Sequence, residues 1–422
     1  MAKEKIVIVG TGWAGFTVSQ KLDDKKFEII VISPEDTSPY TPLLASAACG
    51  LFDFSLAEES IRHKGRRLTY LQARVENVDF QAKSCKCLSA CDDVRGGEGR
   101  AFVVSYDRLI LAPGCVTNTF RTPGADEYSF FVRNVADAKK VQHRLKQLLE
   151  VASLPGIGEE EQRGLLHVII VGGGPTGVEL AAEMSDLFND DFSKLYPDLK
   201  GKMSITIHDA APFILGAFEE ALRKHSLESF SKRNVTVITG SKIKKVEVDS
   251  ITTEAEGRIP CGMILWTAGN KQCALVDRLE TAKTDKLPRI MTDDYLHVLT
   301  PRPEQEPMQD VFALGDAADI KKYFLPTTAE VAVQKAEYLA RVLNNSSNAA
   351  SPAPFEYKQK ALVAYIGGHD GVVHGRPEWS GPRAWAAWRS KNLLWTRSWR
   401  RKFMITIYWA LDWLGGKEIA RA

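Results

Sequence analysis

Two clusters of glycines carry the clearest chemical signal in the sequence. Each follows a short apolar run and precedes a helix-like segment; the glycines are Gly10, Gly12 and Gly15 in the first cluster and Gly172, Gly174 and Gly177 in the second. Glycines at this spacing let the backbone approach a pyrophosphate, and the N-terminus of the following helix offers it unpaired N–H groups. The sequence therefore predicts two dinucleotide sites.

An acidic residue follows the next strand-like segment after each cluster. Glu35 stands twenty residues after Gly15, and Asp209 follows the apolar segment 204–208. An acid at this place binds ribose hydroxyls, and Asp209 would repel a 2′-phosphate, so the second site should favour NADH over NADPH. The neighbouring His208 would soften that preference.

These residues need strands and helices to position them. We expect a strand over 6–9, a helix over 16–22 and a strand over 27–32, and the same series over 167–171, 178–188 and 204–208, with the polar segment 189–202 inserted. Two further apolar segments, ending at Gly114 and at Gly315 with Asp316 after it, fit a flavin partner. A corresponding strand in the second series ends at Ala268 and Gly269.

The order of these segments predicts the domains. The fold class is α/β, with two Rossmann-like dinucleotide-binding domains and a C-terminal amphipathic helical segment. An FAD-binding domain is expected to be discontinuous, over 1–129 and 286–360, with an NADH-binding domain over 130–285 inserted in it. Residues 361–422 would form a membrane-anchoring region.

Composition excludes several classes of protein. The 422 residues have a formal net charge of only +2, which argues against a nucleic-acid partner bound through a strongly basic surface. The seven cysteines are odd in number and irregularly spaced, as in proteins of a reducing compartment. Cys85, Cys87 and Cys91 lack further ligands at zinc-finger spacing, so we expect surface thiols and no metal.

The C-terminal residues suggest a membrane surface as a partner. Seven of the nine tryptophans lie between Trp379 and Trp413, among several arginines and lysines. Phe403, Ile407 and Leu411 repeat every four residues in an expected helix over 399–414, which is too short and too polar to span a bilayer. The helix would lie on the lipid surface, or pack on the protein's own core or across a homodimer interface. No signal peptide or spanning segment is expected.

Longer motifs resemble one family of flavoproteins. They are 40–46 (YTPLLAS), 172–179 (GGGPTGVE), 326–334 (PTTAEVAVQ), 364–367 (AYIG) and 412–414 (DWL) with 419–421 (IAR). Together they resemble the type II, or alternative, NADH dehydrogenases of the pyridine nucleotide-disulfide oxidoreductase superfamily. The resemblance implies that NADH reduces FAD and that the flavin then reduces a quinone, ubiquinone or menaquinone, without pumping protons.

The resemblance and the glycine patterns give the candidate site residues. Those expected to bind FAD are Gly10, Gly12, Trp13, Ala14, Gly15, Ser33, Glu35, Thr41, Pro42, Leu43, Ala112, Gly114, Gly315 and Asp316. Those expected to bind NADH are Gly172, Gly174, Pro175, Thr176, Gly177, Asp209, Ala268 and Gly269. The candidate catalytic residues are Glu179, near the nicotinamide, and Glu330 and Gln334, which with Leu44 would bind the quinone.

The candidate quinone residues depart from the family pattern at one position. The family has two glutamines where this chain has Glu330 and Gln334. They are four residues apart, so a helix beginning after Pro326 would put both on one face. A carboxyl group here could donate a proton to the quinone or alter the choice of acceptor.

The resemblance also implies partners and a location. We expect a peripheral protein of the mitochondrial inner membrane, or of the bacterial inner membrane in a prokaryote, and a homodimer. Two other functions stay open. One is a soluble FAD-dependent NADH peroxidase or disulfide reductase that uses Cys49, although Cys49 lacks a CxxxxC partner. The other is an NADH-sensing flavoprotein in signalling.

Overall fold

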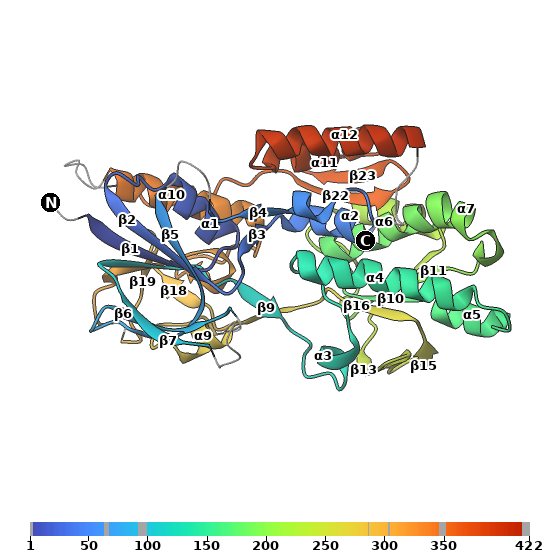
Figure 1. The fold of residues 1–422 in the computed structure, drawn as a ribbon, viewed down its shortest axis with the longest axis horizontal. Coiled ribbons are helices and arrows are strands. Elements are labelled where there is room, and N and C mark those ends of the chain that lie inside the picture. Colours follow the sequence, from blue (N-terminus) through green and yellow to red (C-terminus); the bar gives the residue numbers. More distant parts are fainter. Residues whose placement is uncertain are drawn as a thin grey trace. The chain divides into compact units, whose positions relative to one another are not determined.

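The computed structural model describes residues 3–62, 67–91, 99–285, 287–302, 304–345 and 352–415. The chain divides into two compact units (Figure 1). The first comprises residues 1–38, 59–116 and 270–359, and the second comprises residues 39–58, 117–269 and 360–422. Residues 361–422 therefore belong to the second unit in this division, together with residues 130–269.

A ten-stranded sheet forms the centre of the first unit. Its order is β21 (Ala318–Ile320), β18 (Ile290–Thr292), β19 (His297–Val298), β20 (Met308–Ala313), β8 (Arg108–Leu111), β1 (Glu4–Val9), β2 (Phe27–Ser33), β5 (Leu68–Asp79), β6 (Ser84–Ser89) and β7 (Ala101–Ser105). The pairs from β20 through β8, β1 and β2 to β5 are all parallel. Parallel strands are buried on both faces, which explains why residues 6–9 and 29–32 are continuously apolar.

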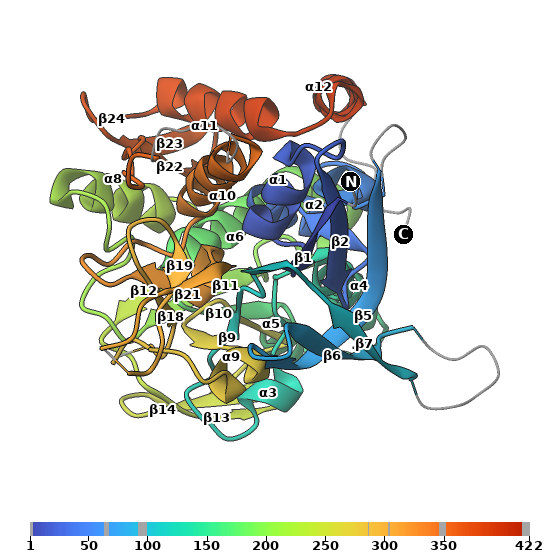
Figure 2. The same cartoon turned by 90° about the vertical axis from the view of Figure 1, so that its left-hand side faces the viewer.

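Helices cover this sheet. α1 (Trp13–Lys21) packs beside α10 (Ala329–Asn344), as Figure 2 shows, and α9 (Ala274–Arg278) packs near β5. The side chain of Thr328 accepts a hydrogen bond from the N–H of Val331 and so caps α10. This confirms the expected helix after Pro326. α1 begins three residues before its expected start at Phe16, directly at the glycine cluster.

The second unit contains a smaller parallel sheet of its own. Its order is β12 (Val235–Thr239), β11 (Ser204–Asp209), β10 (His167–Val171) and β16 (Met263–Trp266), beside an antiparallel sheet of β13 (Ile243–Glu247), β14 (Ser250–Thr253) and β15 (Gly257–Pro260). Up to residue 269, its α-helices are α2 (Leu44–Ala48), α3 (Ala125–Tyr128), α4 (Val135–Ala152), α5 (Glu159–Leu165), α6 (Pro175–Asp186), α7 (Ser193–Leu195) and α8 (Glu220–Ser231).

The remaining elements complete the two units. After α6, the chain continues as one π-helical stretch over Leu187–Phe192, which overlaps the start of the segment 189–202 that sequence patterning marks as inserted. There are also two two-stranded sheets. One pairs β3 (Thr37–Pro39) with β4 (Glu58–Ser60), and the other pairs β9 (Cys115–Thr117) with β17 (Asn270–Gln272). Boundaries between the two units fall within or next to these strands. Two βαβ units around parallel sheets confirm the predicted α/β class.

The last part of the chain is a small sheet covered by helices. β22 (Leu362–Gly367), β23 (Asp370–His374) and β24 (Trp379–Ser380) are antiparallel, and α11 (Pro382–Trp395) lies on β22 and β23 (Figure 1). α12 (Trp399–Gly415) follows and contacts α11. The helix expected over 399–414 is thus confirmed.

Candidate functional site

The first glycine cluster forms a tight turn between β1 and α1. Gly10 has a φ of +102°, and a Cβ built there would lie 2.2 Å from the carbonyl oxygen of Ala112. A Cβ on Gly15 would lie 2.0 Å from the carbonyl oxygen of Gly10. At Gly12, by contrast, no atom lies within 4 Å of the Cβ position. Gly10 and Gly15 are therefore needed to make the turn, whereas Gly12 leaves open space at the N-terminus of α1, as a bound pyrophosphate requires.

The other candidate FAD residues of the first unit lie at strand ends near this turn. The hydroxyl groups of Thr11 and Ser33 are 2.9 Å apart. Glu35 is exposed, and its backbone carbonyl accepts a hydrogen bond from the Tyr70 hydroxyl. Ala112 is buried and Gly114 is half-buried. The exposed Glu35 side chain is thus available to a ribose.

Gly315 and Asp316 lie beside the same helix. A Cβ on Gly315 would be 3.2 Å from the Cβ of Ala14 in α1. Burial raises the pKa of Asp316, and its carboxylate accepts a hydrogen bond from the Cys115 thiol. The predicted residues Thr41, Pro42 and Leu43 form a short 3-10 helix in the second unit, where Thr41 is exposed and Leu43 is buried.

The second glycine cluster repeats the geometry of the first. A Cβ on Gly172 would lie 2.8 Å from the Ala268 nitrogen, and one on Gly177 would lie 2.0 Å from the Gly172 carbonyl oxygen. The Cβ position of Gly174 is open, and Gly174 precedes Pro175, the first residue of α6. The two loops thus fit two dinucleotides by the same physical test.

Asp209 shapes this second loop. One carboxylate oxygen accepts a hydrogen bond of 2.5 Å from the N–H of Gly173, and the other accepts one of 2.7 Å from the N–H of Ala211. The carboxylate therefore lies at the glycine turn, as a ribose-binding acid should. The exposed residues Pro175 and Thr176 stand at the same end of α6.

The expectation that His208 would soften the preference for NADH is wrong. Its imidazole is buried, with Nδ1 2.9 Å from the Ser241 hydroxyl. Burial lowers the pKa of His208 to about 4, so the ring is neutral near pH 7. A neutral, buried ring offers no positive charge to a 2′-phosphate.

Glu179 lies on α6, five residues after the loop glycine Gly174. Its carboxylate accepts a hydrogen bond of 2.8 Å from the indole nitrogen of Trp388, on α11. Burial, with a smaller contribution from Glu183, raises the pKa of Glu179 to about 7. Glu179 is thus a carboxyl group that changes charge near neutral pH.

Sequence reasoning missed the partners of the α6 carboxylates. Beside Trp388, these include Ser46, whose hydroxyl donates to Glu183 over 2.7 Å, and Tyr365, whose hydroxyl donates to Asp186. Arg233 forms an ion pair with Asp186. Trp388, Ser46 and Tyr365 lie within segments that the motifs or the tryptophan count single out, but nothing in the sequence pairs them with α6.

Glu330 and Gln334 lie on one face of α10, as predicted. The amide nitrogen of Gln334 is 2.6 Å from a carboxylate oxygen of Glu330, which is buried. Gln334 also pairs with both backbone groups of Lys358. This pairing fixes the amide orientation. Leu44, the other candidate quinone residue, is buried on α2 of the second unit.

The cysteines are placed differently from expectation. Cys85 and Cys87 are buried on β6, so the prediction that they are surface thiols is wrong; Cys91 is exposed. Alternate residues of β6 face the sheet's core, which the sequence interval alone did not reveal. Cys49 is 1% exposed at the end of α2. Such burial disfavours the alternative in which Cys49 reacts with peroxide or a disulfide.

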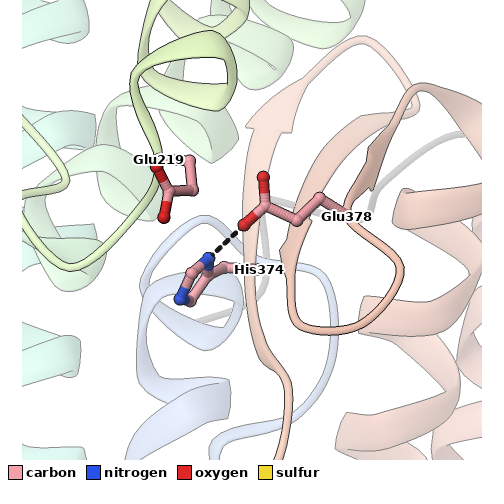
Figure 3. A group of neighbouring side chains, drawn as sticks. All are labelled: Glu219, His374 and Glu378. Atoms are coloured by element: carbon pink, nitrogen blue, oxygen red, sulfur yellow. Dashed lines mark hydrogen bonds and ion pairs between the residues drawn. The ribbon is translucent and has the colours of Figure 1, made fainter.

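One group of side chains in the described residues resembles a metal ligand set. Glu219, His374 and Glu378 converge on the second unit, and Figure 3 shows the His374 ring directed at Glu378. The distance from His374 Nδ1 to the Glu378 carboxylate is 2.6 Å. This hydrogen bond by itself accounts for the closeness of the pair, so we assign the group no metal.

The C-terminal helix presents an exposed apolar stripe. We define the α12 stripe as Trp399, Phe403, Leu411 and Leu414, which are 85%, 68%, 56% and 73% exposed. On another side of α12, Ile405 is fully buried, and Trp409 lies 4.3 Å from the guanidinium of Arg389 on α11. Within the described residues, no helix is both long and apolar enough to cross a membrane.

Comparisons with known proteins agree with this geometry. The sequence model of the pyridine nucleotide-disulphide oxidoreductase family matches residues 4–336. A probable NADH dehydrogenase of Dictyostelium discoideum is 32% identical, over 99% of this chain and 91% of the relative. The internal alternative NAD(P)H-ubiquinone oxidoreductase A1, mitochondrial, of Solanum tuberosum is 30% identical, over 99% of this chain and 88% of the relative.

A solved structure is similar over the whole chain. The structure of NDH2 from Plasmodium falciparum in complex with NADH has a TM-score of 0.91 and 26% identity, and the match covers 100% of both chains. These matches confirm the resemblance indicated by the motifs. The chain therefore belongs to the pyridine nucleotide-disulphide oxidoreductase family and, within it, to the alternative NADH dehydrogenases.

Proposed function

We propose that this protein is a non-proton-pumping NADH:quinone oxidoreductase that uses FAD. The observation that carries the proposal is the pair of glycine loops, each closed by two glycines that admit no Cβ and open at the middle one. The relatives named NAD(P)H-ubiquinone oxidoreductases support the quinone as acceptor. Bound FAD would accept the hydride that leaves NADH and would pass two electrons to the quinone.

The chain's own residues bind and orient the two dinucleotides. The loop at Gly12 and the N-terminus of α1 would hold the pyrophosphate of FAD, with Glu35 at a ribose and Asp316 at the ribityl chain. The loop at Gly174 and the N-terminus of α6 would hold the pyrophosphate of NADH. Asp209 disfavours a 2′-phosphate by charge repulsion, so NADH is the preferred donor.

The two candidate ends of the reaction use different carboxyl groups. Glu179 would stand near the nicotinamide, where an ionised carboxylate stabilises the positive charge that the ring gains as its hydride leaves. Glu330 and Gln334 would contact the quinone head group, and Glu330 could supply a proton as quinol forms.

The α12 stripe supports attachment to a lipid surface. Four large apolar side chains that are more than half exposed are costly in water, and a helix with such a face lies in the bilayer interface. The basic side chains of the same segment would pair with anionic lipids. The relatives named as mitochondrial support a mitochondrial location, and the inner membrane stays a prediction. Homodimer formation stays a prediction, which light scattering in detergent would test.

The membrane proposal calls for surface substitutions rather than truncation. Removing α11 and α12 would also remove the buried Trp388 and Ile405 and so damage the fold. The double substitution Trp399→Glu and Phe403→Glu changes only exposed side chains. We expect it to abolish binding to cardiolipin-containing liposomes while the thermal unfolding temperature stays within about 2 °C, since surface changes usually cost less than ~0.5 kcal/mol. Unaltered liposome binding would refute the proposal.

The two half-reactions are tested separately by stopped flow. The oxidised yellow protein is mixed with NADH under anaerobic conditions, and the reduced protein is then mixed with a short-chain ubiquinone. We expect rapid bleaching and rapid recovery of the flavin absorbance. Bleaching without recovery would reject quinone as the acceptor and favour an NADH-sensing flavoprotein or a Cys49-dependent reductase.

A further inference from the structure

Trp388 is a buried residue whose polar side-chain atom, the indole nitrogen, donates a hydrogen bond to Glu179. Its side chain is 4% exposed on α11, and its indole N–H donates to a carboxylate oxygen of Glu179 on α6 over 2.8 Å. An indole N–H can only donate a hydrogen bond. It therefore stabilises the ionised form of Glu179 relative to the protonated form.

The position of the indole is fixed from its other side. The Tyr365 ring stacks on Trp388, with ring centroids 4.9 Å apart and an angle of 21° between the planes. The Tyr365 hydroxyl donates to Asp186, which also pairs with Arg233. Trp388 is therefore tied to α6 in two ways, directly through Glu179 and indirectly through Tyr365 and Asp186. The indole cannot rotate without breaking these contacts.

Close packing around Arg233 holds this chain in place. A Cβ on Gly367 would lie 2.7 Å from the guanidinium, and one on Gly368 would lie 2.1 Å from it. The two glycines therefore let the β22–β23 turn close over Arg233. The N–H of Gly368 also donates to Asp186 over 3.0 Å.

Several charged and polar groups face Glu179 from the elements packed against it. Glu183 of the same helix raises its pKa, while Lys391 of α11, a backbone N–H at Tyr365 of β22 and the Trp388 indole lower it. Burial has the largest effect and favours the neutral form. The indole is the side-chain donor that opposes burial, so its removal should shift the balance toward the protonated acid.

We propose that Trp388 is a positioning residue for Glu179: its indole N–H fixes the orientation of the carboxylate and favours its ionised form. The proposal rests on the proposed function, because it gives Glu179 a place near the nicotinamide. It adds Trp388, on α11, to the residues that take part in the NADH half-reaction. The helix that precedes the lipid-facing stripe thereby helps to set the charge next to the hydride donor.

The substitution Trp388→Phe removes the N–H donor. Phenylalanine keeps an aromatic ring beside Tyr365 but cannot donate to Glu179. We expect the midpoint of the pH dependence of flavin reduction by NADH to rise by about one unit or more, the usual effect of losing one hydrogen bond to a charged group. The substitution Trp385→Phe is the matched control. It removes an indole of the same helix that packs against His369, and the midpoint should not move.

A second readout needs no turnover. In the oxidised protein without NADH, the indole ¹H–¹⁵N signal of Trp388 should titrate with the protonation of Glu179. In Glu179→Gln this titration should disappear. The signal is assigned from its loss in Trp388→Phe, or, if that variant does not fold, from its altered position in Glu179→Gln.

The outcomes separate this proposal from the proposed function. Equal midpoints in wild type and Trp388→Phe, or an indole signal that titrates unchanged in Glu179→Gln, would overturn the positioning role. In the Glu179→Gln background, Trp388→Phe should not shift the pH profile further, and an additive shift would also overturn it. A wild-type protein whose flavin NADH fails to reduce would instead reject the proposed function, whereas the indole titration would still test the pairing.

Discussion

The substitution Gly174→Ala tests whether the second loop binds the pyrophosphate of NADH. No atom lies within 4 Å of the Cβ position, and the φ of −72° suits alanine. The folded protein should therefore lose only about 0.5–1 kcal/mol, the difference between glycine and alanine at the N-cap of a helix. The added methyl group would, however, stand where a phosphate must approach the backbone N–H groups of α6.

The expected loss of affinity follows from that geometry. A hydrogen bond to a charged group contributes about 1.5–3 kcal/mol, so losing one such bond should raise the Kd for NADH about 10- to 100-fold. The assay is the rate of anaerobic flavin reduction as a function of NADH concentration, with thermal unfolding measured on the same sample. The limiting rate at saturating NADH should change less than the half-saturating concentration.

A matched variant shows that the effect depends on position. In Gly177→Ala the Cβ would lie 2.0 Å from the Gly172 carbonyl oxygen, so the helix must move away from the strand. We expect a loss of stability of about 1–3 kcal/mol or more. If Gly174→Ala binds NADH as tightly as wild type, the pyrophosphate does not lie on this loop and the argument fails.

Three further predictions concern charged groups. Glu330→Gln keeps an acceptor for the Gln334 amide, so we expect flavin reduction by NADH to be nearly unchanged and reoxidation by ubiquinone to change about tenfold, or ~1.4 kcal/mol; equal effects on both half-reactions would contradict the assignment. Asp209→Asn keeps an oxygen for one of the two N–H groups, that of Gly173 or that of Ala211, and removes the charge, so the ratio of NADPH to NADH activity should rise about tenfold in paired steady-state assays. Burial raises the pKa of Glu179 to about 7, so its carboxyl group is protonated below that pH. The rate of flavin reduction should therefore fall as the pH falls through about 7. Glu179→Gln should remove this pH dependence, and a flat wild-type profile would disprove the prediction.

Local sequence patterns predicted the elements that bear the glycine loops. A parallel strand buried on both faces must be continuously apolar, and a turn position that admits no Cβ must be glycine. The structure of residues 6–15 and 167–177 can therefore be predicted from these segments alone. The helix after Pro326, which Thr328 caps, can also be predicted from neighbouring residues alone. The same holds for the pairing of Gln334 with Glu330, which are four residues apart on that helix.

Contacts between distant residues were decided only by the tertiary structure. Trp388 and Glu179 are 209 residues apart, and tryptophan counts pointed to lipid rather than to a buried hydrogen bond. The burial of Cys85 and Cys87 depends on β5 and β7, and the neutral state of His208 depends on the elements that exclude water from it. The types and spacing of residues specify what a segment can do with its own backbone. Burial and long-range pairing depend on which other segments cover it, and that is settled only when the whole chain packs.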